Sequence, residues 1–195
     1  MGLVTAAWLV PDLWTGAVTG RIAVGSRVLL DASFAAARAR LAVLASDGML
    51  LEASEVAYGE GITGLVQVAG PAAGLTRLAG VRLGHLADTD DCADIALQWE
   101  AISADGKLFT ALDADLMLVP ARRARIDPSQ TLAQAGDRIT ALALAGGYRP
   151  QPGPAGAGLD QAIVRHCASA AIRSFLDRVA GALVHPAGTA GTCRP

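Results

Sequence analysis

The chain is poor in aromatic residues, which make up 4% of its 195 residues, although 52% of the chain is hydrophobic. Most of its apolar content is therefore alanine, leucine and valine. A chain of this length is expected to form one domain with a substantial core. Small side chains either leave space inside such a core or let helices and sheets pack closely. Composition alone leaves both interiors open.

The chain also lacks an excess of charge of either sign. Its formal net charge of −2 gives no electrostatic footprint for nucleic acid. The basic cluster Arg122, Arg123 and Arg125 has no interleaved aromatic residues, which is typical of a solvated loop. Lysine is nearly absent, since Lys107 stands against fifteen arginines, and we interpret this as a bias of genomic base composition.

Long apolar runs are missing too. No run approaches the roughly 20 residues of a membrane span. The first residues carry neither a basic leader nor a convincing cleavage site. We therefore expect no stable membrane insertion and a cytoplasmic location.

Cysteine is scarce, and its pattern excludes the usual cysteine chemistry. Cys92, Cys167 and Cys193 are odd in number, widely spaced and without a CxxC pair. This favours reduced thiols over a disulfide framework or a zinc site. The sequence also has no nucleophile elbow, metal-binding histidine pair or phosphate loop, and the GxGxxG-like stretch at 59–64 lacks a preceding strand. We expect no metal and no cofactor.

The first regular pattern is a strand followed by helices. Alternation over 20–30 puts five residues on one face, namely Ile22, Val24, Ser26, Val28 and Leu30. Asp31 or Ser33 is expected to cap a helix that ends at Asp47-Gly48. A second helical piece is expected over roughly 49–58. The glycines and proline from Gly59 to Gly74 are then expected to break the chain into loops.

From about residue 77 the period returns to two, which predicts further strands. Their apolar faces comprise Ala79, Val81, Leu83 and His85, then Ile95, Leu97, Trp99 and Ala101, then Leu112, Ala114, Leu116 and Leu118, and finally Leu142, Leu144 and Tyr148. Asp113 and Asp115 fall on the opposite face, which predicts a sheet with one wet side. A turn at 104–107 and a long loop at 121–136 separate these strands.

A proline- and glycine-rich corner at 150–158 leads into a long helix over 159–184. About 26 helical residues span on the order of 40 Å, enough to cross a small sheet. We divide the chain into an N-terminal arm at 1–19 with Trp8 and Trp14, a domain at 20–185 and a flexible tail at 186–195. The fold class is α+β, a curved antiparallel β-sheet wrapped around a long C-terminal helix.

Residues 20–184 resemble the helix-grip fold of the START-like, or SRPBCC, superfamily. The segments that carry the resemblance are Leu97-Gln98-Trp99-Glu100-Ala101, Leu108-Phe109, Leu112-Asp113-Ala114-Asp115-Leu116, Gly147-Tyr148-Arg149-Pro150 and Gly156-Ala157-Gly158-Leu159-Asp160. The chain is similar to polyketide cyclase-like, uncharacterised actinobacterial members of that superfamily. Its loop at 121–136 is longer than the hairpin found in such proteins.

The resemblance implies a cavity between the sheet and the C-terminal helix that binds a hydrophobic small molecule, such as a lipid or a polyketide-like compound. The ligand-binding residues would be Leu83, His85, Leu97, Trp99, Leu116, Leu118, Leu142, Leu144, Tyr148, Ile163, His166 and Ala170, with Phe175 a further candidate. Ligand binding is the leading hypothesis, and the sequence sets no oligomeric state.

Two other functions remain open from the sequence. The first is a cyclase, aromatase or dehydratase acting on a polyketide-like substrate, in which His85, Tyr148 or Arg149 would supply acid–base or oxyanion chemistry. It requires at least two of these side chains to converge in one pocket. The second is a structural or regulatory interaction protein with a filled core, in which Trp8 and Trp14 would dock a partner.

Overall fold

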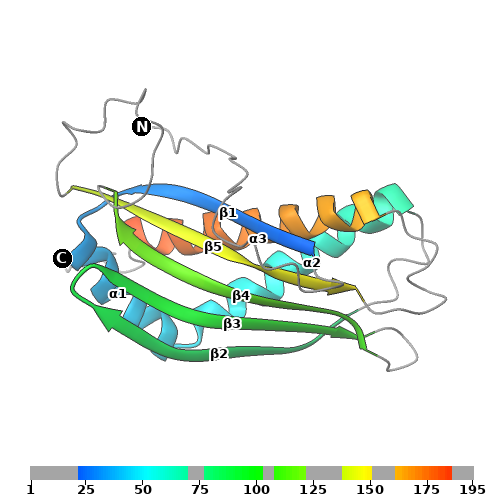
Figure 1. Ribbon diagram of the computed structural model, residues 1–195, viewed down its shortest axis with the longest axis horizontal. Helices are drawn as coiled ribbons and strands as arrows, with labels where there is room; N and C mark the ends of the chain where they lie inside the picture. Colours follow the sequence, from blue (N-terminus) through cyan, green and yellow to red (C-terminus); the bar gives the residue numbers. More distant parts are fainter. Residues whose placement is uncertain (1–21, 70–76, 103–107, 122–137, 151–160, 186–195) are drawn as a thin grey trace, which may run out of the picture.

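The computed structural model describes residues 22–69, 77–102, 108–121, 138–150 and 161–185. Within these ranges the chain forms five strands and three helices (Figure 1). In chain order they are β1 (Ile22–Asp31), α1 (Phe34–Ser46), α2 (Met49–Ala69), β2 (Arg77–Thr89), β3 (Cys92–Ile102), β4 (Leu108–Pro120), β5 (Ile139–Pro150) and α3 (Gln161–Val184).

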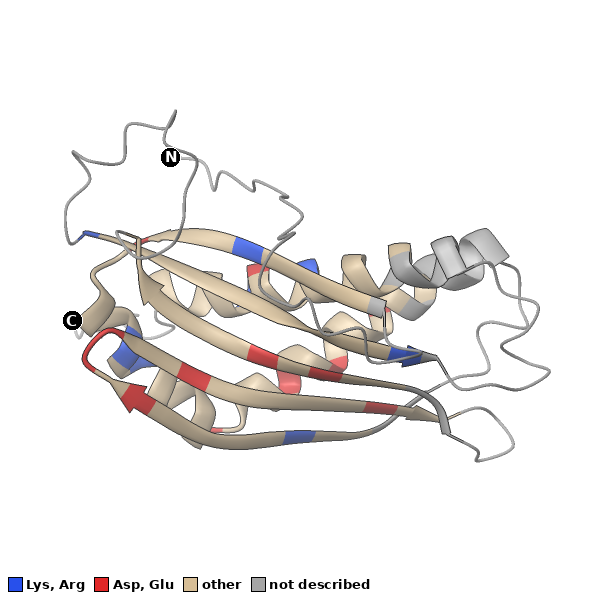
Figure 2. Cartoon of the chain, in the orientation of Figure 1, with Lys and Arg blue, Asp and Glu red and all other residues tan. Residues whose placement is uncertain are grey.

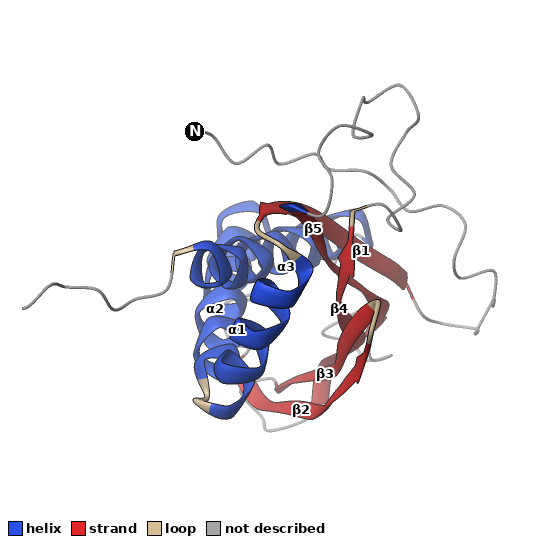
Figure 3. Ribbon diagram, turned by 90° about the vertical axis from the view of Figure 1, so that its left-hand side faces the viewer, coloured by secondary structure: helices blue, strands red, loops and turns tan. Residues whose placement is uncertain are grey.

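The strands form one curved sheet in the order β1-β5-β4-β3-β2, and each neighbouring pair is antiparallel. The helices form a second layer against one face of this sheet (Figure 3). Helix α3 packs along β1 and against α2. This α+β arrangement is the helix-grip fold that the sequence predicts. The predicted turn at 104–107, the arm at 1–19 and the tail at 186–195 lie outside the described residues.

Helix α1 begins and ends where its local sequence requires. Of the two predicted caps, Ser33 is the one used, because its side-chain oxygen accepts a hydrogen bond from the Ala36 amide at 3.4 Å. The helix ends at Ser46, and Gly48 then takes a φ of 76°. A residue with a Cβ rarely adopts that left-handed conformation, so glycine fits this position.

Helix α2 is longer than the sequence suggests. It continues to Ala69, so the expectation that glycines from Gly59 onward break the helix is wrong. Each glycine in a helix costs about 1 kcal/mol relative to alanine. Packing against α3 offsets this cost, and Ala57 and Gly61 are both buried. Small residues at these positions let the two helix backbones approach closely.

The core lies between the helices and the inner face of the sheet, which is the face toward the helices. Its largest fully buried side chains are Leu30, Leu41, Leu50, Ile95, Leu116, Leu118, Leu142, Leu144, Ile172, Phe175, Leu176 and Leu183. The outer face carries acidic residues along β3 and β4, among them Asp94, Glu100, Asp113 and Asp115 (Figure 2). Asp115 is exposed, which confirms the predicted wet side.

Two arginines of α1 hold the layers together at one end. Arg38 forms an ion pair with Asp88 of β2 at 3.3 Å. Arg40 donates hydrogen bonds to the carbonyls of Leu183 and Val184, the last residues of α3. A cation at a helix C-terminus also interacts favourably with the helix dipole. Among the described helices, none combines the length and apolarity needed to cross a membrane.

Candidate functional site

The antiparallel register aligns the inward-facing side chains of β3, β4, β5 and β1 in four rows. The first row lies nearest α1, and the fourth lies at the other end of the sheet. In that order the rows are Ala93–Leu118–Leu142–Val28, Ile95–Leu116–Leu144–Ser26, Leu97–Ala114–Gly146–Val24 and Trp99–Leu112–Tyr148.

The buried side chains of the fourth row are slightly more exposed than those of the first row, and Ser26 at the edge of the second row is half-buried. In the first row the side chains are 0 to 2% exposed, as for Leu118 at 0% and Val28 at 2%. In the fourth row Trp99, Leu112 and Tyr148 are 4, 5 and 8% exposed. All these side chains point toward the helices, and their exposed fraction is higher in the fourth row than in the first. We name the third and fourth rows the aromatic end.

The middle of the aromatic end is built from very small residues. Ala114 and Gly146 are paired neighbours in the third row. A Cβ on Gly146 would lie 2.5 Å from Ala114 Cα and would also collide with the Asp113 carbonyl oxygen. Strands β4 and β5 therefore approach each other here in a way that excludes any side chain at position 146. The surface formed by Ala114 and Gly146 therefore lies lower than the large side chains of the fourth row beside it. We call this surface the floor.

An aromatic contact between sheet and helix stands beside this floor. The rings of Trp99 and Phe175 are 5.7 Å apart between centroids and meet at 88°, in a T-shaped arrangement. Phe175 is fully buried. Such pairs stabilise a core by about 0.5–1.5 kcal/mol beyond their buried area. This contact fixes the side-chain position of Trp99 relative to α3.

Most of the sequence-predicted ligand-binding residues face inward. Seven of them are buried on the inner face, namely Leu97, Trp99, Leu116, Leu118, Leu142, Leu144 and Tyr148. Leu83 is half-buried against the same core. Among these, Leu97, Trp99 and Tyr148 belong to the aromatic end. The four leucines of the first two rows lie in the tightly packed part of the core.

His85 does not point inward, and the prediction that it shares a face with Leu83 is wrong. Leu83 pairs with Leu97, but Leu86 pairs with Ile95, so β2 contains one extra residue between these pairs. This bulge reverses the alternation, because a shift of one residue moves every later side chain to the opposite face. Leu86 is the residue that packs on the core, and His85 is exposed.

The buried face of α3 is not the face that the sequence predicts. His166 and Ala170 are exposed, so their predicted place on the inner wall is wrong. The buried stripe of α3 consists of Ala171, Ile172, Phe175, Leu176, Val179, Ala180 and Leu183. Because α3 packs against both the sheet and α2, its buried arc includes the α2 side as well. The side chain of Ile163 lies outside the described part of the molecule.

Arg149 belongs to a polar cluster on the outer face. It donates to Asp113 Oδ2 at 2.6 Å, and the side-chain nitrogen of Gln98 donates to Asp113 Oδ1 at 3.1 Å. Arg82 and Glu100 form a further ion pair at 3.7 Å on β2 and β3. Exposed pairs of this kind contribute between 0 and about 1 kcal/mol each. Their evident role is to brace neighbouring strands.

The three candidate catalytic residues are therefore separated. His85 is exposed on β2, Arg149 is exposed on the outer face of β5, and Tyr148 is buried on the inner face. Strands β3 and β4 lie between β2 and β5. The convergence that an acid–base mechanism requires is not found for these residues. Among the described residues, no three His, Cys, Asp or Glu side chains gather closely enough to hold a metal ion.

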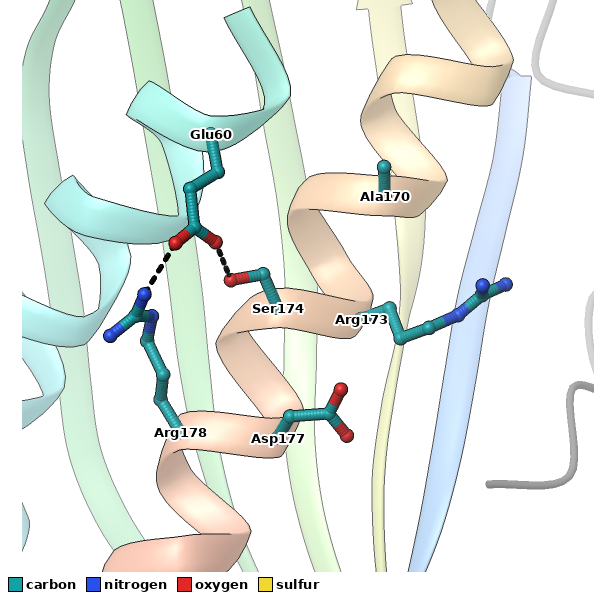
Figure 4. A pocket seen from close by; sticks show the side chains of 6 residues that line it. All are labelled: Glu60, Ala170, Arg173, Ser174, Asp177 and Arg178. Atoms are coloured by element: carbon teal, nitrogen blue, oxygen red, sulfur yellow. Dashed lines mark hydrogen bonds and ion pairs between the residues drawn. The ribbon is translucent and has the colours of Figure 1, made fainter. Parts of the chain in front are cut away.

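A shallow depression of about 530 Å³ lies between α2 and α3 (Figure 4). Its polar lining comes mainly from α3, and Glu60 of α2 reaches into it. Glu60 accepts hydrogen bonds from the Ser174 hydroxyl and from Arg178, whose guanidinium also forms an ion pair with it. The Ser174 hydrogen bond, and then the Arg178 hydrogen bond, lower the pKa of Glu60 below its usual 4.5.

No sequence pattern indicated this cluster, since Glu60 falls in a stretch predicted to be a loop. Glu60 and Arg178 neutralise each other across the two helices, and Arg173 and Asp177 line the same depression. The arrangement ties α2 to α3 near the middle of each helix. It leaves the aromatic end of the inner face as the better candidate for a small-molecule site.

No protein-family model matches this chain, and no curated protein matches it. Among solved structures, the chain is similar to TTHA0849 from Thermus thermophilus, with 14% identity and a TM-score of 0.32, over 83% of this chain and 99% of that one. It is also similar to the Zhui aromatase/cyclase from Streptomyces sp. R1128, with 16% identity and a TM-score of 0.30, over 86% of this chain and 99% of that one. TM-scores this low assign neither a family nor an activity.

Proposed function

We propose that this protein binds a hydrophobic small molecule, lipid-like or polyketide-like, between the aromatic end of the sheet and α3. The observation that carries the proposal is the graded exposure of the inner face. Inward-facing side chains go from 0–2% exposed in the first row to 4–8% in the fourth. The higher exposed fraction at the aromatic end supports a ligand site there and not beside α1.

The chemistry of the aromatic end supports an apolar ligand. Its described side chains are aliphatic or aromatic, their polar atoms are the Trp99 indole nitrogen and the Tyr148 hydroxyl, and Ala114 and Gly146 leave a low floor between larger neighbours. Ligand sites in proteins are typically apolar concave surfaces with a few polar groups. The first two rows, packed against α1 and the end of α3, would form the closed base of such a site.

Filling the floor tests the proposal. Ala114→Leu adds three carbon atoms at the centre of the third row, where a ligand would lie. Ala23→Leu is the matched control, because Ala23 is exposed on the outer face of β1 at the same end of the sheet. Binding is measured by the fluorescence of nile red, an uncharged apolar dye, and stability by denaturant unfolding.

We expect the wild-type protein and Ala23→Leu to bind nile red with equal affinity. Ala114→Leu should bind at least about tenfold more weakly while keeping its stability, because the new side chain occupies the ligand's space. A filled core predicts the reverse: no dye binding by the wild type, and a loss of about 1–3 kcal/mol for Ala114→Leu from overpacking. That second pattern would exclude ligand binding and favour an interaction protein.

A further inference from the structure

The indole nitrogen of Trp99 is a buried hydrogen-bond donor without an acceptor among the described residues. Trp99 is 4% exposed, and its Nε1 atom is sealed from solvent with no partner in hydrogen-bonding distance. Buried polar groups are paired in nearly all cases, so each exception requires an explanation. A phenylalanine or leucine would bury apolar area here without the cost of a desolvated N–H.

The surroundings of Trp99 restrict what could pair with it. The described side chains of the third and fourth rows, and the buried stripe of α3, include no carboxylate, guanidinium, ammonium or imidazole group, and the Tyr148 hydroxyl is the other polar side-chain group of the two rows. The Phe175 ring meets the indole in a T-shaped contact, and a ring face is only a weak acceptor. A charged ligand would remain uncompensated in this environment.

We infer that Trp99 is the polar anchor of the site and selects an uncharged apolar ligand that carries a hydrogen-bond acceptor, such as a carbonyl oxygen. This inference rests on the proposed function. The apolar body of the ligand would cover the floor at Ala114 and Gly146, and its oxygen would accept the Nε1–H hydrogen bond. Because Nε1 is covered in the structure, the acceptor reaches it only after side chains around Trp99 shift.

The test uses two probes that differ by one acceptor. Fluorenone carries a carbonyl group where fluorene carries a methylene group, and both are rigid and uncharged. Their dissociation constants are measured by equilibrium dialysis for the wild type, for Trp99→Phe and for Trp14→Phe. Trp14→Phe makes the same chemical change at a position outside the described residues and serves as the control.

We expect Trp99→Phe to weaken fluorenone binding about fivefold relative to fluorene binding, the effect of losing one neutral hydrogen bond. Trp14→Phe should leave the ratio of the two constants unchanged. Binding of fluorene by Trp99→Phe shows that this variant is folded and keeps its site. In the wild type, fluorenone but not fluorene should move the indole N–H proton signal of Trp99 downfield.

Two results overturn these ideas separately. If both probes bind but Trp99→Phe leaves their ratio unchanged, Trp99 is not the anchor, and the Phe175 ring suffices for its N–H. If neither probe binds the wild type, the proposed binding function fails, and the role of Trp99 fails with it. Stronger relative binding of fluorene by the wild type would also contradict the inference.

Discussion

Replacing Gly146 with alanine should strongly destabilise the protein. A Cβ at this position would lie 2.5 Å from both Cα and Cβ of Ala114 and would collide with the carbonyl oxygen of Asp113. Two of these three atoms belong to the backbone of β4, which cannot rotate away as a side-chain end can. Strand β4 or β5 must therefore shift, and the shift disturbs the ladder that joins them.

The size of the stability loss depends on which atoms the new Cβ would meet. Overpacking a core costs about 1–3 kcal/mol, and collision with backbone belongs in the upper part of that range. We expect a loss of about 2–3 kcal/mol, which is a large fraction of the ~5–15 kcal/mol that stabilises a typical domain. The φ of Gly146 is not positive, so the whole effect is steric.

Two other strand glycines give a graded control. A Cβ on Gly80 meets nothing within 4 Å, so Gly80→Ala should be neutral or stabilising by up to about 1 kcal/mol, because alanine restricts the unfolded chain. A Cβ on Gly25 would lie 3.1 Å from the Leu144 carbonyl oxygen, so Gly25→Ala should fall between the other two.

Guanidinium unfolding of the three variants measures the free energy of unfolding and its dependence on denaturant. The expected order of stability is Gly80→Ala, then Gly25→Ala, then Gly146→Ala, with similar slopes for all three. Equal stability of Gly146→Ala and Gly80→Ala would refute the close approach of β4 and β5, and with it the low floor of the aromatic end.

Three further predictions concern the contacts around the helices. Phe175→Ala should lose about 3–5 kcal/mol in denaturant unfolding, because Phe175 is fully buried against Trp99; a loss below about 1 kcal/mol would contradict that packing. Glu60→Gln should be less stable than the wild type at neutral pH, and the gap should close as pH falls below the usual glutamate pKa of 4.5. The folded pKa of Glu60 is lowered, so its contribution is present above the unfolded pKa and is lost as pH falls through the folded one; a gap that persists in acid would exclude the charge as its source. Thr140→Val should cost about 1–3 kcal/mol in thermal unfolding, because the Thr140 hydroxyl donates at 2.7 Å to the Ala32 carbonyl, which would lose that partner; an unchanged Tm would count against this bond.

The faces of most strands could be predicted from the sequence, because one face of the sheet is buried and the other is wet. In such a sheet the alternation of apolar and polar residues has a direct physical cause. Leu97, Leu116, Leu142 and Leu144 are therefore buried where the period of two places them. Asp115 is exposed for the same reason.

The alternating pattern predicted the wrong face for His85, because such a pattern does not reveal an extra residue in a strand. The bulge between Leu83 and Leu86 depends on pairing with β3, which is a contact between distant parts of the chain. Gly84 was the one local signal, since a glycine inside a strand often marks a bulge or a close approach. A Cβ on Gly84 would indeed lie 3.1 Å from that of Ala96.

The predicted end of α2 and the predicted buried face of α3 were wrong, because tertiary packing overrides local preference there. Gly59 and Gly61 weaken a helix by intrinsic propensity, yet α2 continues through both while it packs on α3. The same contact broadens the buried arc of α3 to Ile172 and Leu176 and leaves Ala170 outside. Neither result could be read from one helix alone, because each depends on the other.

Arg40 joins the C-terminal end of α3 to α1. Its hydrogen bonds hold the last carbonyls of the helix, beside the fully buried Leu183. Toward the other end of α3, His166 and Ala170 are exposed. Glu60 of α2 holds the middle of the same helix through Ser174 and Arg178. The helix is therefore held at its end and also beside Phe175, which keeps the Phe175 ring against Trp99.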